Sequence, residues 1–158
     1  MRAGSGGLFV GPPTAESGIG TLREALDIFP GARIDIAQRH DDLQQRMRAA
    51  AYLVLPSLSY EAGPPRALVE AFACGLPVIA SRLAGLAELI EPGRNGLLFE
   101  PGSARDLARR LAWAEAFPEK MRQMGECAQA DYHARFVADW GWQKLYGERR
   151  KNGVRPLP

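Results

Sequence analysis

The chemistry that this sequence offers is concentrated between two apolar runs, at residues 52–55 and 77–81. Glu61, Arg66 and Glu70 lie between them. A helix that begins near Arg66 leaves its first amide groups without intrahelical partners, and these groups attract phosphate together with the positive end of the helix dipole. Glu70, about one turn further, can accept hydrogen bonds from vicinal hydroxyl groups. Phosphate and sugar hydroxyls together describe a sugar nucleotide, so we expect that ligand here.

The segment between the two runs is predicted to be a helix, which makes a βαβ unit. Both runs are short and β-prone, and the first ends at Pro56-Ser57. Pro65 fits the start of the helix, because its fixed φ is helical and its missing N–H would be unpaired there. The strands of such a unit are parallel, so the loops at their carboxyl ends share one edge of the sheet. Ligands of open α/β sheets bind at that edge, where Arg66 and Arg82 are both expected.

The other apolar runs extend the same pattern to a whole α/β domain. Strands are predicted at 8–11, 32–37 and 97–99, with helices behind them, and Ser103 with Asp106 forms the capping box of a later helix. We therefore predict one doubly wound parallel sheet of about five strands. The predicted boundaries are 1–7 for a linker or cut end, 8–150 for the domain and 151–158 for a tail. The positions expected to face the core are Ile19, Leu22, Ala25, Leu26, Phe29, Leu43, Met47, Leu107, Leu111 and Ala114.

Composition argues against several classes of function. The net charge is only +2 and no basic stripe with interleaved aromatic residues occurs, so a dedicated nucleic-acid binder is not expected. No apolar run is long enough to span a membrane. Cys74 and Cys127 have neither metal-binding nor redox spacing, so no metal site is expected. Free thiols suit a reducing cytoplasm, with peripheral attachment to the inner face of the membrane as the alternative location.

Taken in chain order, the motifs resemble the donor-binding half of group 1 (family 4) retaining glycosyltransferases. The motifs that carry the resemblance are Pro56-Ser57, Glu61, the run 68–81, Gly85, Glu88 and the run 95–99. The resemblance implies a Rossmann-like domain that forms one half of a GT-B fold. It also implies a nucleotide-diphosphate sugar as donor substrate, with no cofactor. The implied partner is an N-terminal acceptor domain or a separate subunit, and a homodimer is the other possibility.

The same resemblance assigns roles to individual residues. In the family, two glutamates separated by seven residues bracket the site, with the second on the ribose of the donor and the first near the transferred sugar. Glu70 matches the second, and Glu61 is the candidate catalytic residue. Eight residues separate them here, so strict spacing puts Ala62 in the first position; either the loop bulges by one residue or that role is lost. The expected donor-binding residues are Gly11, Ser17, Gly63, Arg66, Ala67, Leu68, Glu70, Arg82 and Gly85.

The first strand-to-helix turn departs from the family pattern. There the family has Gly-Arg and, five residues later, Lys-Gly, whose basic side chains hold the donor diphosphate. Pro12 and Ser17 occupy these two positions. Losing one oriented charge commonly costs on the order of 3 kcal/mol in the transition state. Arg66 and Arg82 are candidate replacements, unless they are surface arginines in weak ion pairs.

We therefore predict a donor-binding domain for glycosyl transfer that is weak or inactive in isolation. The alternative is a non-catalytic interaction module that keeps the fold. An unrelated phosphate-binding sheet protein is disfavoured, because neither a Walker loop nor a dinucleotide fingerprint occurs. The strand and helix that the family usually inserts between Ile36 and Tyr52 are missing here. Near the C-terminus, some of Trp140, Trp142 and Tyr146 are expected to form an exposed apolar patch or a dimer contact.

Overall fold

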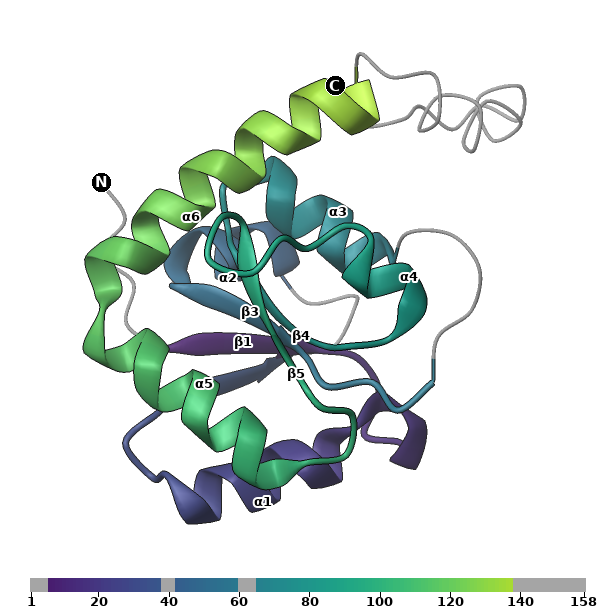
Figure 1. Cartoon of the computed structure of the whole chain (residues 1–158), viewed down its shortest axis with the longest axis vertical. Helices are drawn as coiled ribbons and strands as arrows, with labels where there is room; N and C mark the ends of the chain where they lie inside the picture. Colours follow the sequence, from purple (N-terminus) through teal and green to yellow (C-terminus); the bar gives the residue numbers. More distant parts are fainter. Residues whose placement is uncertain (1–5, 38–41, 60–64, 138–158) are drawn as a thin grey trace.

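A five-stranded parallel sheet forms the centre of the molecule (Figure 1). The computed structural model describes residues 6–37, 42–59 and 65–137. The strand order is β2-β1-β3-β4-β5, and every neighbouring pair is parallel. The strands are β1 (Gly7–Val10), β2 (Ile34–Ala37), β3 (Tyr52–Leu55), β4 (Val78–Ser81) and β5 (Gly96–Phe99).

The direction in which the sheet grows reverses beside β1. The chain runs from β1 outward to β2, then returns to the other side of β1 for β3 and continues to β4 and β5. The loops that follow β1 and β3 therefore leave adjacent strands in opposite directions. This is the switch point at which doubly wound sheets bind their ligands.

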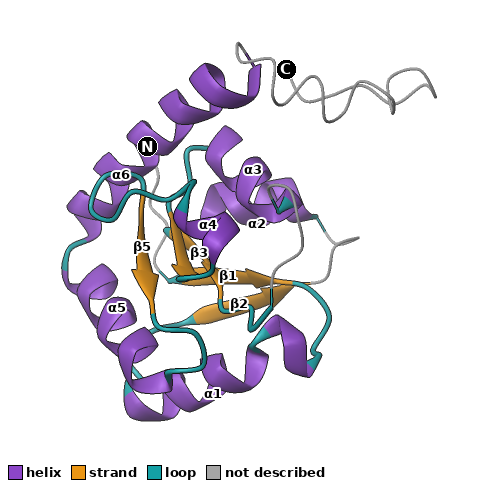
Figure 2. Cartoon of the chain, turned by 45° about the vertical axis from the view of Figure 1, so that its right-hand side comes forward, coloured by secondary structure: helices purple, strands orange, loops and turns teal. Residues whose placement is uncertain are grey.

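Helices cover both faces of the sheet (Figure 2). One core packs α1 (Ile19–Ile28) and α5 (Ala104–Ala116) on the sheet, and the second packs α2 (Leu43–Ala49) and α3 (Arg66–Ala73) on the opposite face. Helix α6 (Pro118–Asp131) contributes to both cores. The remaining elements are the 3-10 turn η1 (Ala15–Ser17), the single turn α4 (Ala84–Ala87) and the π-helical turn η2 (Tyr132–Val137).

The predicted fold is confirmed, and so are eight of the ten core positions expected of the helices, which are buried because each lies on the apolar stripe of its helix. Leu26 and Phe29 are only partly buried and pack against the core that α1 and α5 form with the sheet. Strand β1 begins at Gly7, one residue before the predicted boundary, because Gly7 already pairs with Ile34 and Tyr52 on the two flanking strands. Within the described residues, α2 is the one helix between β2 and β3, which agrees with the expected deletion.

The cap of α5 differs from the prediction in one hydrogen bond. Ser103 Oγ accepts from the N–H of Asp106 at 3.1 Å, as expected of an N-cap. The carboxylate of Asp106, however, accepts from the N–H of Glu100 at 2.8 Å instead of that of Ser103. The cap thus ties the start of α5 to the end of β5. None of the described helices has the length and apolarity that crossing a bilayer requires.

Candidate functional site

The N-terminus of α3 lies at the carboxyl edge of the sheet, after β3. Pro65 is the N-cap, with an extended backbone (φ −61°, ψ 137°), so the helix begins at Arg66. Its first backbone hydrogen bond runs from the N–H of Val69 to the carbonyl of Pro65 at 3.2 Å. The N–H groups of Arg66, Ala67 and Leu68 therefore have no acceptor within the helix. These are the amides for which phosphate contacts were predicted.

Glu70 is held beside these amides. Its Oε2 lies 3.5 Å from Nε of Arg66, one turn away, and its side chain is 21% exposed whereas that of Arg66 is 60% exposed. Leu68 and Val69 are fully buried and Phe72 is too, so packing fixes the rotation of α3 about its axis. That rotation determines which way Arg66 and Glu70 face.

Glu70 also lines a cavity of about 560 Å³ between α2, α3 and η2. Leu43 and Met47 line it from α2, and Tyr132 and His133 line it from η2. Glu70 thus stands in the wall of a cavity that extends along α3 to Cys74 and Gln129, which also line a second cavity. Sequence reasoning did not anticipate η2 in this wall, because π-helical turns have no simple sequence signal.

The turn after β1 is held in place by backbone and side-chain hydrogen bonds. Gly11 donates its N–H to the carbonyl of Ala37 at 3.1 Å and has a φ of +143°. Ser17 Oγ donates to the carbonyl of Thr14 at 2.7 Å, and the N–H of Ser17 is 3.3 Å from Oγ1 of Thr14. The hydroxyl hydrogen of Ser17 is thus used within η1. What remains for a ligand at this position is an acceptor oxygen without charge.

The loops after β1 and β3 are fastened together across the switch point. The N–H of Leu58 donates to the carbonyl of Glu16 at 3.0 Å. Gly18 has a φ of +80°, and a Cβ on it would lie 1.7 Å from the carbonyl oxygen of Pro56. Only glycine fits there. Sequence reasoning did not single out Gly18, although a glycine directly before an apolar helix was an available signal.

Arg82 and Gly85 follow β4 at the same edge of the sheet. The N–H of Arg82 donates to the carbonyl of Phe99 at 2.8 Å, and its Nε lies 3.6 Å from Oε2 of Glu100. Both side chains are at least half exposed, so the pair is a surface ion pair. Gly85 is half-buried within α4. The structure thus brings Gly11, Ser17, Arg66, Ala67, Leu68, Glu70, Arg82 and Gly85 to one edge.

Several predicted residues lie outside the described part of the chain. These are Glu61, Gly63, the three aromatic residues Trp140, Trp142 and Tyr146, and the ranges 1–5 and 151–158. Among the residues that are described, no group of three or more His, Cys, Asp or Glu side chains is placed to hold a metal ion.

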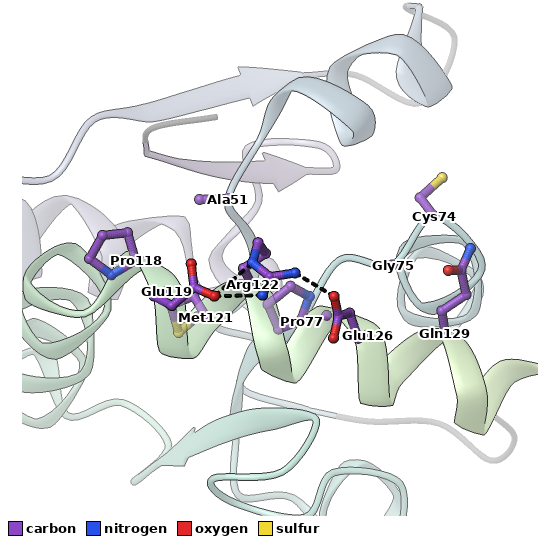
Figure 3. A pocket seen from close by; sticks show the side chains of 11 residues that line it. Ala51, Cys74, Gly75, Pro77, Pro118, Glu119, Met121, Arg122, Glu126 and Gln129 are labelled. Carbon is purple, nitrogen blue, oxygen red and sulfur yellow. Dashed lines mark hydrogen bonds and ion pairs between the residues drawn. The ribbon is translucent and has the colours of Figure 1, made fainter. Parts of the chain in front are cut away.

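A larger cavity, of about 680 Å³, lies at the opposite edge of the sheet (Figure 3). Ala51 and Pro77, which precede β3 and β4, line it together with residues of α6. The guanidinium of Arg122 bonds to both Glu119 and Glu126 there, so these charges satisfy one another. Because open α/β sheets bind ligands at their carboxyl ends, the larger cavity is not the candidate site.

The parallel sheet, its helices on both faces and its switch point define a doubly wound α/β domain. A sequence profile described as "Glycosyl transferases group 1" matches residues 8–115. This match covers more than half of the chain, so the chain belongs to the group 1 glycosyltransferases.

Known proteins agree with this assignment. An uncharacterised glycosyltransferase of Methanocaldococcus jannaschii is 34% identical over 111 residues, which are 70% of this chain and 30% of that relative. Anabaena HepE in complex with UDP-glucose has a TM-score of 0.77 at 22% identity, over 92% of this chain and 49% of HepE. The C-terminal domain of a group 1 glycosyltransferase from Francisella tularensis has a TM-score of 0.62 at 19% identity, over 84% of this chain and 86% of that domain. The two structures establish a GT-B type fold, and the chain spans about half of HepE or less than a third of the Methanocaldococcus relative.

Proposed function

We propose that this chain is the donor-binding domain of a glycosyltransferase and holds a nucleotide-diphosphate sugar at the carboxyl edge of its sheet. The observation that carries the proposal is the juxtaposition of three amides without helical acceptors, at Arg66 to Leu68, with the cavity-lining carboxylate of Glu70. The amides and Arg66 suit the diphosphate. The carboxylate suits two neighbouring hydroxyl groups of the ribose. HepE, a structural neighbour, was crystallised with UDP-glucose, which supports a nucleotide sugar as ligand.

Arg66 and Arg82 supply positive charge in this scheme, in place of the family's arginine and lysine at Pro12 and Ser17. Among the described residues, Arg66 pairs with Glu70 and Arg82 pairs with Glu100, and both arginine side chains are at least half exposed. Such pairs contribute about 0–1 kcal/mol, so a diphosphate can displace them at little cost. Glu61 remains the proposed catalytic residue near the transferred sugar, and retention of configuration rests on the family resemblance.

The acceptor is proposed to bind elsewhere, on an N-terminal domain or on a separate subunit, with a second copy of this chain as the alternative. The relatives are considerably longer than the matched segment, which leaves room for such a domain in them. A cytoplasmic location is proposed because Cys74 and Cys127, both within the described residues, are not joined in a disulfide bond, which suits a reducing compartment.

Titration of the isotope-labelled chain with UDP-glucose and GDP-glucose, followed by amide chemical shifts, tests the donor site. We expect the largest shifts at Arg66, Ala67 and Leu68, with smaller ones at Gly18. Shifts confined to the α6 cavity around Arg122, or no shifts with either sugar nucleotide at millimolar concentration, would refute the donor site.

One observation favours a second candidate function, that of a non-catalytic interaction module. The hydroxyl of Ser17 is used within its own turn, and Pro12 has neither charge nor N–H, so neither of these two positions supplies a cation. An interaction module that kept the fold but lost the chemistry would also lack charged side chains at these two positions. The titration above separates the two functions: amide shifts around Arg66 to Glu70 support the glycosyltransferase domain, and no shifts with either sugar nucleotide support the module.

A further inference from the structure

The corner between α5 and α6 carries an aromatic pair, of which Phe117 is exposed and Trp113 is partly buried against the core. The rings of Trp113 and Phe117 stack with centroids 5.0 Å apart and planes tilted by 39°. Phe117 is 46% exposed, although it is a large apolar side chain, and its neighbours Ala116 and Pro118 are exposed as well. Contiguous exposed apolar groups commonly mark a contact with another surface.

Basic side chains precede and follow this pair in the sequence of α5 and α6. Arg105, Arg109 and Lys120 are exposed, and none of them forms an ion pair with any residue in the described ranges 6–37, 42–59 and 65–137. They differ in this from Arg110 and Arg122, which face carboxylates on their own helices.

The acidic side chains of the same segment are already engaged. Residues 104–122 contain five basic and three acidic residues. Asp106 caps the turn before α5, Glu115 accepts from the buried hydroxyl of Tyr52 at 2.7 Å, and Glu119 pairs with Arg122. The charge that the corner presents to solvent is therefore positive.

The corner lies away from the candidate donor site. Helix α5 begins beyond the carboxyl end of β5 and runs back across the sheet, so it ends at the amino edge (Figure 1). Arg105 and Arg109 lie on its outer face, because Leu107 and Leu111 face the core, and Trp113 follows one turn later at the margin between the two faces. A surface that meets this corner leaves the carboxyl edge of the sheet open.

We propose that the α5–α6 corner, with Trp113 and Phe117 flanked by Arg109 and Lys120, docks the protein on an anionic phospholipid bilayer. Aromatic rings settle at the level of the lipid headgroups, and nearby basic side chains are attracted to anionic lipids. A second copy of the chain fits less well, because a two-fold contact would bring the same positive charges together. The docking is peripheral and does not depend on the donor site.

Co-sedimentation of the full chain with vesicles tests the proposal without any sugar nucleotide. The chain should bind vesicles of equal parts phosphatidylcholine and phosphatidylglycerol at low salt, and high salt should release it. Vesicles of phosphatidylcholine alone should retain little of it. Equal retention by both kinds of vesicle, or by neither, would overturn the proposal.

Two variants with matched controls locate the contact. The double reversal R109E/K120E removes two attractive charges, so the affinity for the anionic vesicles should fall by more than about thirtyfold, and R33E is the control at another exposed arginine. Phe117→Ser should also weaken binding, whereas Ile36→Ser should not, although both side chains are 46% exposed. If thermal melts show that Phe117→Ser is unfolded, the charge reversal decides alone. Binding by R109E/K120E that equals that of R33E would place the contact elsewhere and remove the proposal.

Discussion

Nε of Arg66 and Oε2 of Glu70 lie 3.5 Å apart across the first turn of α3. The arginine side chain is mostly exposed, whereas the glutamate is largely covered and lines a cavity. A pair at this spacing on a helix contributes only about 0.3–0.5 kcal/mol. It therefore orients the two side chains without holding them against a competing ligand.

Glu70→Gln should weaken the binding of UDP-glucose by about tenfold to a hundredfold, measured by calorimetry. The substitution keeps the shape of the side chain but turns charge-assisted hydrogen bonds to two ligand hydroxyls, which contribute about 1.5–3 kcal/mol each, into neutral ones of about 0.5–1.5 kcal/mol each. Glu88→Gln is the control, because Glu88 is exposed and lies beyond α4. An affinity that is unchanged in Glu70→Gln would exclude this carboxylate from the site.

Arg82 and Glu100 should affect donor binding in opposite directions. Arg82→Ala removes a positive charge from the edge of the sheet and should reduce the affinity for UDP-glucose by about fivefold. Glu100→Gln releases Arg82 from its surface pair and should increase the affinity by a smaller factor. Calorimetry measures both affinities. Both changes should become smaller at high salt, because salt screens the charges. If the two variants change affinity in the same direction, Arg82 does not act on the donor.

The sheet and the helix after β3 could be predicted because their signals are local. Each strand is a short apolar run between turn residues, and Pro65 followed by a stripe of apolar residues sets the start of α3. The contact of Gly18 with Pro56 could not be predicted, since it joins two loops whose distance depends on the strand order. The same holds for Arg82 and Glu100, which are neighbours only because β4 and β5 pair in register.

The replacement of a family lysine by Ser17 could be read from the sequence, but its consequence could not. A serine in this place could have pointed its hydroxyl at a ligand. The structure instead closes η1 with that hydroxyl, because the carbonyl of Thr14 lies within 2.7 Å. Competition between a ligand and a local backbone acceptor depends on the conformation of the turn, which sequence spacing does not determine.

Gly18→Ala should destabilise the domain by more than about 2 kcal/mol. Its φ of +80° disfavours any side chain, and the new Cβ would collide with the carbonyl oxygen of Pro56. Gly20→Ala is the matched control in the next turn of the chain, because a Cβ there meets nothing within 4 Å. Gly20 lies within α1, so that variant should gain about 0.5–1 kcal/mol from helix propensity. Urea denaturation measures both, and equal stabilities of the two variants would contradict the close contact between the loops.

Asp131→Asn should destabilise the domain near neutral pH by about 1.5–3 kcal/mol. The carboxylate accepts hydrogen bonds from Nη1 of Arg94 at 2.6 Å and from Nδ2 of the buried Asn95 at 2.7 Å. Burial acts to raise the pKa of Asp131, but these bonds outweigh burial, and the pKa lies below its ordinary value. Asparagine keeps the shape but loses the charge that Arg94 requires.

The cost of Asp131→Asn should depend on pH in a defined direction. A carboxyl group with a lowered pKa in the folded state contributes stability above its unfolded pKa, near 3.9, and loses it as pH falls through the folded value. The difference in unfolding free energy between wild type and Asp131→Asn should therefore be constant from pH 7 to about pH 5 and shrink below about pH 4. Glu119→Gln is the control: Arg122 lowers the pKa of Glu119 as well, but the pair is exposed, so little stability should be lost at any pH. A cost for Asp131→Asn that stays the same at pH 3 would mean that packing, and not the charge on Asp131, holds α6 to the turn before β5.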